Sequence, residues 1–326
     1  MRTISIIVSL LVSTTAWAQY TPAAGQNAPR RAYRPVLKKS GEYAKDKLGR
    51  TRFQPVKAAP KVDRHGNASG NQYDLAIDGA FQGQTVLILD QVGNTLVNTR
   101  KALARKGFAT VVFRGKPKVK QLKKALSKSC QVWLISAGAA RLEKGHIAAI
   151  KAFFKKGHGV YIWGDNDPLY ADANRLAGAL IPGLKMKGNL YGNKTVGVAH
   201  KGSAGVRKGH LITTGVQHLY EGITIATLSF GQSSTRKSRI YNNGQLKQNR
   251  RAWKDYIAKG FTPLLFGSAG NLVSAAYQAQ GKRLIIDGGF TRLAVSWDDA
   301  GTARYVKNAA AWLVNSERFK DKVARK

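Results

Sequence analysis

Carboxylate side chains are scarce in this sequence, and several of them stand where an apolar run ends. The chain has 17 Asp and Glu against 54 Lys and Arg. Asp90 ends one apolar run and Asp287 ends another, while Asp165 and Asp167 follow a third. If these runs are parallel strands, their carboxyl ends meet at one edge of a sheet, where ligands bind in open α/β folds. The polar residues expected to line that crevice are Asp90, Asn94, Thr95, Ser136, Asp165, Asn166, Asp167 and Asp287.

Asp165 and Asp167 are the candidates for a metal site. Together with Asn166 they could present hard oxygen ligands to a divalent cation such as Ca²⁺ or Mg²⁺. The alternative is that an aspartate at a strand-to-helix turn caps the helix by accepting backbone N–H groups. The chain has neither an EF-hand loop nor another dedicated metal spacing. Capping is therefore favoured, and a divalent cation is kept as the candidate cofactor.

Nucleophilic and histidine chemistry has weaker support. A serine triad of the α/β-hydrolase type needs a Gly-x-Ser-x-Gly elbow, and the chain has none. Cys130 is the single cysteine and opens an apolar run, which favours a buried structural thiol. His210, His218 and Glu221 are close in sequence but have no known ligand spacing. A packed strand edge is therefore favoured there over a base or metal pair.

The apolar runs alternate with helical patterns, which indicates βαβ units around a parallel sheet. Continuous β-branched and apolar stretches are typical of strands that are buried on both faces. Strands are predicted at 85–90, 109–113, 132–136, 159–163, 263–266, 273–278 and 283–287, and helices at 95–106, 119–127, 146–156, 168–182 and 300–315. Residues 185–260 are rich in Gly, Lys and Thr, and a β-rich or loop insertion is expected there.

Three short motifs, in this order, resemble a known fold family. Residues 159–167 read as a strand that enters a tight turn, residues 210–216 are similar to a His-Pro-Ile-Thr-x-Gly stretch, and residues 282–290 end in Ile-Asp-Gly-Gly-Phe. They resemble the trehalose-utilisation-like branch of the class I glutamine amidotransferase-like superfamily. The resemblance covers about residues 83–315. It implies an α/β domain of the flavodoxin-like three-layer sandwich type, with a mainly parallel sheet.

The catalytic cysteine of that superfamily is missing at the matching turn. Catalytic members carry it in a Gly-x-Cys-x-Gly elbow, where a strand turns into a helix. At that turn this chain has Gly164-Asp165-Asn166-Asp167, and Cys130 stands at the wrong end of a different strand. Because a thiolate is the attacking group in this chemistry, the resemblance implies a non-catalytic relative, or one with different chemistry at the same place.

Residues 1–18 have the pattern of a cleavable signal peptide. Arg2 gives a positive start, residues 4–12 are mainly apolar, and Ala16-Trp17-Ala18 supplies the small-x-small cleavage pattern. The apolar stretch is too short for a bilayer core, which needs about 20 residues, and no later stretch reaches that length. We therefore expect a periplasmic or secreted protein with a disordered basic arm at 19–70 and a basic tail at 316–326.

The formal net charge of +37 indicates attraction to polyanions. For an exported chain the expected partners are anionic envelope polymers or lipids, and cytoplasmic nucleic acid is not expected. The leading hypothesis is an exported, non-catalytic binding protein of the cell envelope, whose sheet-end crevice takes a small or glycan ligand. Two alternatives stay open. One is a metal-assisted hydrolase of a sugar or amide, and the other is polyanion or nucleic-acid binding as the main role, through the arm and residues 232–254.

Overall fold

The computed structural model describes residues 33–35, 38, 40, 42, 44–55, 62–63, 65–67, 71, 73–94, 96–199, 204–230, 259–297 and 300–319. The predicted signal peptide, most of the predicted arm, residues 232–254 and residues 320–326 of the predicted tail lie outside the described residues. Thr95, one of the expected crevice residues, lies outside them as well.

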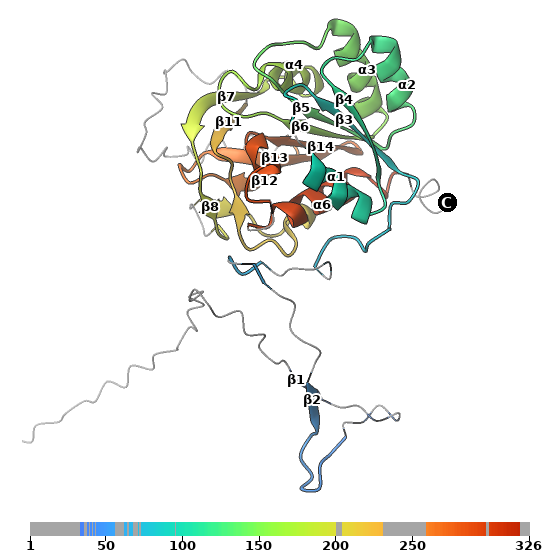
Figure 1. The fold of residues 1–326 in the computed structure, drawn as a ribbon, viewed down its shortest axis with the longest axis vertical. Coiled ribbons are helices and arrows are strands. Elements are labelled where there is room, and N and C mark those ends of the chain that lie inside the picture. Colours follow the sequence, from blue (N-terminus) through green and yellow to red (C-terminus); the bar gives the residue numbers. More distant parts are fainter. Residues whose placement is uncertain are drawn as a thin grey trace, which may run out of the picture.

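An eight-stranded sheet forms the centre of the domain (Figure 1). Five neighbouring strands run parallel, in the order β4, β3, β5, β6 and β14, and β13, β12 and β9 extend the sheet antiparallel to their neighbours. Their bounds are β3 (Thr85–Asp90), β4 (Ala109–Arg114), β5 (Gln131–Ile135), β6 (Gly159–Trp163), β9 (Gly205–Val206), β12 (Phe261–Phe266), β13 (Leu272–Ala279) and β14 (Lys282–Asp287). Each strand predicted from an apolar run is present.

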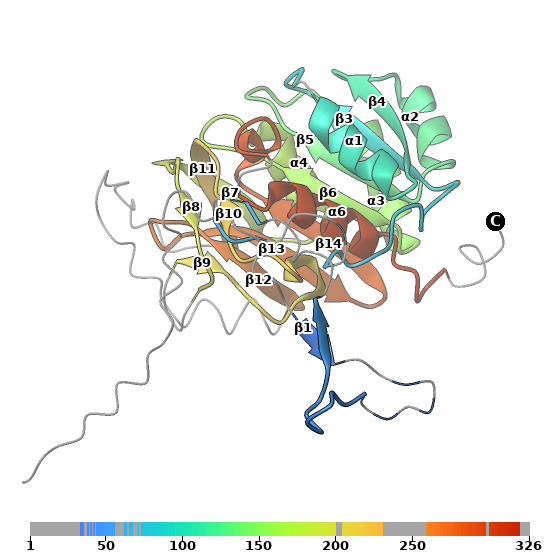
Figure 2. The same ribbon diagram turned by 60° about the horizontal axis from the view of Figure 1, so that its bottom comes forward.

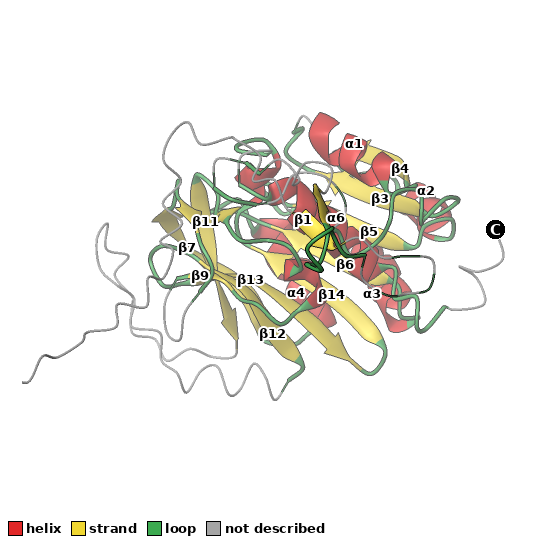
Figure 3. Cartoon of the chain, turned by 90° about the horizontal axis from the view of Figure 1, so that it is seen from below, coloured by secondary structure: helices red, strands yellow, loops and turns green. Residues whose placement is uncertain are grey.

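Helices cover both faces of this sheet and complete three layers (Figures 2 and 3). One layer holds α1 (Val97–Arg105) and α6 (Thr302–Leu313), and the other holds α2 (Val119–Leu126), α3 (Lys144–Lys155) and α4 (Ala171–Leu180). Counted along the chain, the parallel strands have the spatial order 2-1-3-4-5, which is that of flavodoxin-like folds. The predicted α/β three-layer sandwich of flavodoxin-like type is therefore confirmed.

Helix α3 shows how the sequence produces a layer. Its buried residues recur at intervals of three and four, which places Ala149, Ile150 and Phe153 on one face of the helix. The chain then passes through Gly157 at a φ of +96°, a left-handed conformation that glycine adopts at little cost. The apolar face of the helix can therefore pack on the sheet, and the next strand can begin at once.

The described part of the predicted insertion is β-rich, as expected. Two short antiparallel sheets form, one from β7 (Leu184–Tyr191) and β11 (Thr224–Phe230), the other from β8 (Thr195–Val196) and β10 (Leu219–Tyr220). In β7, Leu184 and Met186 are buried while Lys185 is exposed, the alternation of a strand with one solvent face. The pairing of β9 with β12 was not predicted, and it makes part of this segment an edge of the main sheet.

Residues ahead of position 83 also pack on the domain. Asn67 is buried, and its Oδ1 accepts hydrogen bonds from the backbone N–H groups of Gln217 (2.7 Å) and His218 (2.8 Å). Asp74 has no exposed side-chain surface and lies 2.9 Å from the Nζ of Lys106 at the end of α1. The contacts of the domain therefore reach back to Asn67, within the segment expected to form the arm. Farther upstream, β1 (Tyr33–Pro35) pairs antiparallel with β2 (Phe53–Pro55).

Candidate functional site

The parallel strands bring their last residues into one row. Asp90 of β3 pairs with Ile135 of β5, Ile135 with Trp163 of β6, and Trp163 with Asp287 of β14. Residues in register point to the same face of a sheet, so the side chains of this row face the layer of α1 and α6. The structure thus places Asp90 and Asp287 at one edge of the sheet, and their role in binding stays a prediction.

The chain reverses its direction across the sheet between β3 and β5, and ligands bind at such switch points in open α/β sheets. Asp90 is fully buried there. Its Oδ1 accepts hydrogen bonds from the N–H groups of Val92 (3.1 Å) and Gly93 (3.0 Å). Its Oδ2 is buried and has no hydrogen-bond partner among the described residues. Because an unpaired buried polar atom costs free energy, this oxygen is a candidate for contact with a ligand.

Three further unpaired polar atoms lie in or just after the loop that follows β3. Gln91 Oε1, Asn94 Nδ2 and Thr99 Oγ1 are buried and, within the described part of the chain, have no hydrogen-bond partner. The loop itself is held in place, since Gln91 Nε2 donates to the carbonyl of Gly115 (2.9 Å) and Arg141 Nη1 donates to the carbonyl of Gln91 (3.0 Å). We call Asp90, Gln91, Asn94 and Thr99 the β3 cluster.

Asp165, just after β6, has its hydrogen-bonding capacity used within the protein. Its Oδ1 accepts hydrogen bonds from the hydroxyl of Thr224 and the N–H of Asn166, both at 2.8 Å, and its Oδ2 accepts one from the N–H of Thr291 (3.2 Å). Burial raises the pKa of this carboxyl to about 6, and the hydrogen bonds counteract only part of that effect. Asp165 therefore ties β11 and the loop after β14 to the end of β6.

This carboxyl makes stability depend on pH in the acid range. Its pKa is about 6 in the folded chain and about 3.9 in an unfolded one, so the folded protein binds more protons between these values. Its contribution to stability is therefore fully present below about pH 4 and falls by roughly 3 kcal/mol as the pH rises through about 6. The Asp165→Asn variant has no carboxyl to ionise at this position. The Tm of the variant minus that of the parent should therefore increase as the pH rises from about 4 to about 7. Thermal unfolding across this range measures the effect, and a constant difference would contradict it.

The turn after β6 does not gather the predicted metal ligands around one point. Asp165 is buried, Asp167 is exposed, and Asn166 Nδ2 donates to the carbonyl of Asp167 (3.0 Å). Over the described ranges, no group of three or more His, Cys, Asp or Glu side chains could hold a metal ion. Nearby Asp172 instead accepts the N–H groups of Arg141 and Leu142, both at 2.9 Å. A cation held by Asp165 and Asp167 stays a prediction.

Asp287 forms a buried ion pair with Arg292. Its Oδ2 lies 2.8 Å from Nη1 of Arg292, and neither side chain is exposed. Arg292 Nη2 also donates to the carbonyl of Glu221 (2.8 Å), and Asp287 Oδ1 accepts the N–H of Gly289 (3.1 Å). The pair of Asp287 and Arg292 therefore holds the loop after β14 against the end of β10. The pairing with Arg292 was not predicted from the sequence.

Two other residues considered in the sequence have partners within the fold. The hydroxyl of Ser136 accepts a hydrogen bond from the N–H of Ala173 in α4 (3.1 Å). His210 Nδ1 accepts the N–H of Ile212 (3.2 Å), and burial lowers the pKa of this imidazole to about 4. His210 is therefore neutral at physiological pH and caps a short 3₁₀ turn.

A second buried polar group joins Glu221 to the β12–β13 turn. Glu221 accepts hydrogen bonds from the hydroxyl (2.7 Å) and the N–H (2.6 Å) of Ser268, and burial raises its pKa. Asn271 is 1% exposed, and neither of its amide atoms has a hydrogen-bond partner in the described chain. A Cβ on Gly267 would lie 2.6 Å from Asn271 Oδ1 and 2.8 Å from Glu221 Oε2, so a larger residue there would have to displace these two side chains. The sequence carries no sign of this group, because its members are far apart along the chain.

Cys130 lies immediately before β5, at the amino end of the strand, and is buried. Its thiol donates to the carbonyl of Thr85 at 3.3 Å, and burial raises its pKa to about 12. Since the thiolate is the reactive form, we expect a disulfide reagent such as Ellman's reagent to leave the native protein unmodified. The protein unfolded in denaturant should release one equivalent of chromophore. Rapid modification of the native protein would contradict this expectation.

Comparisons with known proteins address fold only. No protein-family model and no curated protein matches the chain. Among solved structures it is similar to a Thermoplasma acidophilum protein described as one component of a GMP synthase, with 9% identity and a TM-score of 0.40, covering 74% of this chain and 98% of that one. It is also similar to an exo-β-1,4-mannosidase from Opitutaceae bacterium strain TAV5 (9% identity, TM-score 0.38) and to the carbohydrate deacetylase Agd3 (12% identity, TM-score 0.39).

These likenesses assign neither family nor activity. The last two comparisons each cover 72% of this chain, but only 36% of the mannosidase and 33% of the deacetylase. The fold assignment accordingly rests on the strand order and layers described above. No helix in the described ranges is long and apolar enough to cross a membrane.

Proposed function

We propose that this chain is an exported, non-enzymatic binding protein whose crevice at the carboxyl ends of β3 and β5 takes a glycan or another small polyhydroxylated ligand. The observation that carries the proposal is the β3 cluster, in which four buried polar atoms at the switch point have no hydrogen-bond partner among the described residues. Their position is where open α/β sheets bind ligands.

The composition of the β3 cluster suits hydroxyl groups. Asp90 Oδ2 and Gln91 Oε1 are acceptors, Asn94 Nδ2 is a donor, and the hydroxyl of Thr99 can do either. A sugar hydroxyl both donates and accepts, so neighbouring hydroxyls can satisfy such a mixed set. A ligand that lacks these groups would leave the same atoms unpaired, which is the usual source of strong discrimination in a polar site.

Two features support binding rather than turnover. The turn after β6 carries Gly164-Asp165-Asn166-Asp167 where the resembling amidotransferase superfamily has its Gly-x-Cys-x-Gly elbow, and the carboxylate of Asp165 is hydrogen-bonded to three protein groups. The thiol of Cys130 is buried at the amino end of β5, away from the carboxyl ends of the strands. We place the chain as a non-catalytic relative of the class I glutamine amidotransferase-like superfamily, in its trehalose-utilisation-like branch.

The charge of the chain supports a second contact, with anionic polymers or lipids of the envelope. A formal net charge of +37 draws a protein toward polyanions without a dedicated site. With the predicted signal peptide, this charge favours a periplasmic or secreted protein held near the cell surface. Retention on heparin that falls steeply with salt tests this contact, since such binding releases counterions.

The crevice is tested by calorimetric titration with a panel of soluble oligosaccharides, using the variant Asp90→Asn. We expect at least one glycan to bind, and the variant to bind it roughly tenfold or more weakly, because a charged acceptor at a hydrogen-bonding site is worth about 1.5–3 kcal/mol. Its Tm should change little, since the side chain keeps the oxygen that accepts from Val92 and Gly93. Glu143→Gln removes one charge from a side chain that is 61% exposed and lies outside the β3 cluster, and it should leave affinity unchanged.

The same panel tests the enzymatic alternative. A metal-assisted hydrolase would use Asp165, whose pKa of about 6 suits proton transfer. Products that form only with Ca²⁺ or Mg²⁺ and disappear in Asp165→Ala would replace the binding proposal. A panel that neither binds nor reacts would also refute a glycan crevice.

A further inference from the structure

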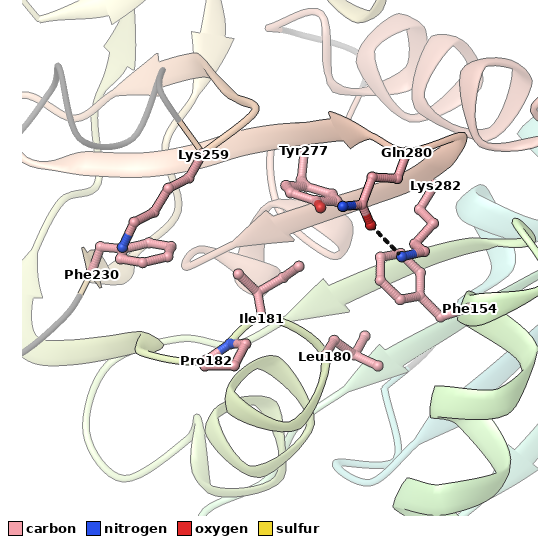
Figure 4. A pocket seen from close by; sticks show the side chains of 9 residues that line it. All are labelled: Phe154, Leu180, Ile181, Pro182, Phe230, Lys259, Tyr277, Gln280 and Lys282. Carbon is pink, nitrogen blue, oxygen red and sulfur yellow. Dashed lines mark hydrogen bonds between the residues drawn. The ribbon is translucent and has the colours of Figure 1, made fainter.

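An open groove lies at the end of β14 opposite to Asp287, on the face of the sheet covered by α3 and α4. Its volume is about 390 Å³, within the usual range of small-molecule sites of about 300–1,000 Å³. Its walls come from α3, the end of α4, the end of β11, the start of β12 and the β13–β14 hairpin (Figure 4). It shares no lining residue with the β3 cluster.

The inner surface of this groove is apolar and continuous with the core. Phe154 and Tyr277 belong to the hydrophobic core on this face, and Leu180, Ile181 and Phe230 are partly buried against it. In Figure 4 the side chains of Leu180 and Ile181 face the ring of Tyr277 across the groove. Covering such a surface with an apolar ligand is favourable, because it removes apolar area from water.

Two lysines stand at the mouth of the groove, and no acidic residue lies among the described residues that line it. Lys259 Nζ lies 3.9 Å from the ring centroid of Phe230, and Lys282 Nζ donates to Gln280 Oε1 at 2.9 Å (Figure 4). None of the nine residues that line the groove is acidic. Within the described part of the chain, the two ammonium groups therefore border an apolar surface with no carboxylate in the lining of the groove.

We propose that this groove binds a single-chain anionic amphiphile, a long-chain carboxylate, with its alkyl chain on the apolar floor and its head group at Lys259 and Lys282. A neutral apolar ligand would remove water from the ammonium groups without replacing it, which is costly for a charged group. A carboxylate restores a charge-assisted hydrogen bond at that point. The inference goes beyond the proposed glycan crevice, because it concerns a different face and edge of the sheet.

The probe is dodecanoate, titrated into the full chain below its micellar concentration at about 0.15 M salt, where long-range attraction is screened. We expect saturable binding of one equivalent. Affinity should rise roughly three- to fourfold for each methylene added between octanoate and dodecanoate, the gain typical of burying an alkyl chain. Dodecanol, which has the chain without the charge, should bind roughly tenfold or more weakly.

Matched lysine variants separate this site from the general charge of the protein. Lys259→Gln/Lys282→Gln should weaken dodecanoate binding roughly tenfold, while Lys123→Gln/Lys124→Gln, two exposed residues of α2, should leave it unchanged. Ile181→Ser should reduce the gain per methylene without removing a charge. Thermal unfolding of each variant shows whether its fold is intact.

Three results would overturn the inference. They are no binding of dodecanoate to the full chain, equal binding of octanoate and dodecanoate, and equal weakening by the two lysine pairs. The last two would indicate attraction to the general positive charge. Asp90→Asn should leave dodecanoate affinity unchanged, so failure of this site and failure of the glycan crevice are distinguishable.

Discussion

Replacing Asp74 with asparagine should lower the free energy of unfolding by about 3–5 kcal/mol, the loss expected when a buried ion pair loses one partner. The carboxylate lies 2.9 Å from Lys106 Nζ, 3.0 Å from Arg304 Nε and 2.6 Å from Lys307 Nζ. The side chain of Asp74 is 0% exposed, and the side chains of the three cations are 1%, 5% and 8% exposed. In the asparagine variant, the three cations would stay close together, and the carboxylate that neutralises part of their charge would be gone.

Urea unfolding measures this loss, and Asp78→Asn provides the control. Asp78 also pairs with Lys106, but its side chain is 34% exposed, so its removal should cost less than about 1 kcal/mol. In Asp74→Asn, part of the loss should be recovered at alkaline pH, because a buried lysine that loses its acid partner gives up its proton more easily. Similar losses for the two variants would show that burial of Asp74 does not set the strength of this contact.

The second large effect is expected at Arg292. Arg292→Met should lower the free energy of unfolding by about 3–5 kcal/mol, because it leaves Asp287 as a buried carboxylate without its counter-ion. The two side chains are 2.8 Å apart and both are 0% exposed. The loss should be smaller at acid pH, since burial raises the pKa of Asp287 and protonation removes the unpaired charge.

A double-mutant cycle checks the origin of this loss. Asp287→Asn/Arg292→Met should be more stable than the sum of the single losses predicts, because residues in direct contact are not additive. Lys116→Met removes a cation whose side chain is 39% exposed and pairs with Glu143 at the surface, and it should cost less than about 1 kcal/mol. Additive losses in the cycle would show that the two side chains act independently.

The fold could be predicted because its strands are continuous apolar runs. β3, β5 and β6 are buried along nearly their whole length, and such runs indicate a covered parallel sheet. β9 could not be found in this way, since it has two residues, Gly205 and Val206, and pairs only because β12 passes beside it. β7 was missed as a strand because three polar residues and a glycine interrupt its apolar positions.

The position of the candidate site could be predicted from the sequence, but the hydrogen-bond and ion-pair partners of its residues could not. The sequence shows where an apolar run ends, and from this we could predict that Asp90, Asp165 and Asp287 lie at one edge of the sheet. The partners of Asp165 were not visible, because Thr224 and Thr291 come from other parts of the chain. Asp74 was missed because it precedes the apolar pattern that begins at residue 83. Its importance comes from three cations that meet only after the helices pack.

The contacts of Asp74 have a consequence for how the domain comes apart. Asp74 and Arg304 are separated by 230 residues of sequence, and nearly the whole α/β domain lies between them. The ion cluster therefore closes the chain into one large loop without a covalent link. Opening at one end weakens the other, because peeling away the segment around Asp74 leaves the cations of α6 without this carboxylate, and loosening α6 leaves Asp74 with Lys106 but without Arg304 and Lys307. We therefore expect the segment around Asp74 and helix α6 to open together, as one cooperative unit.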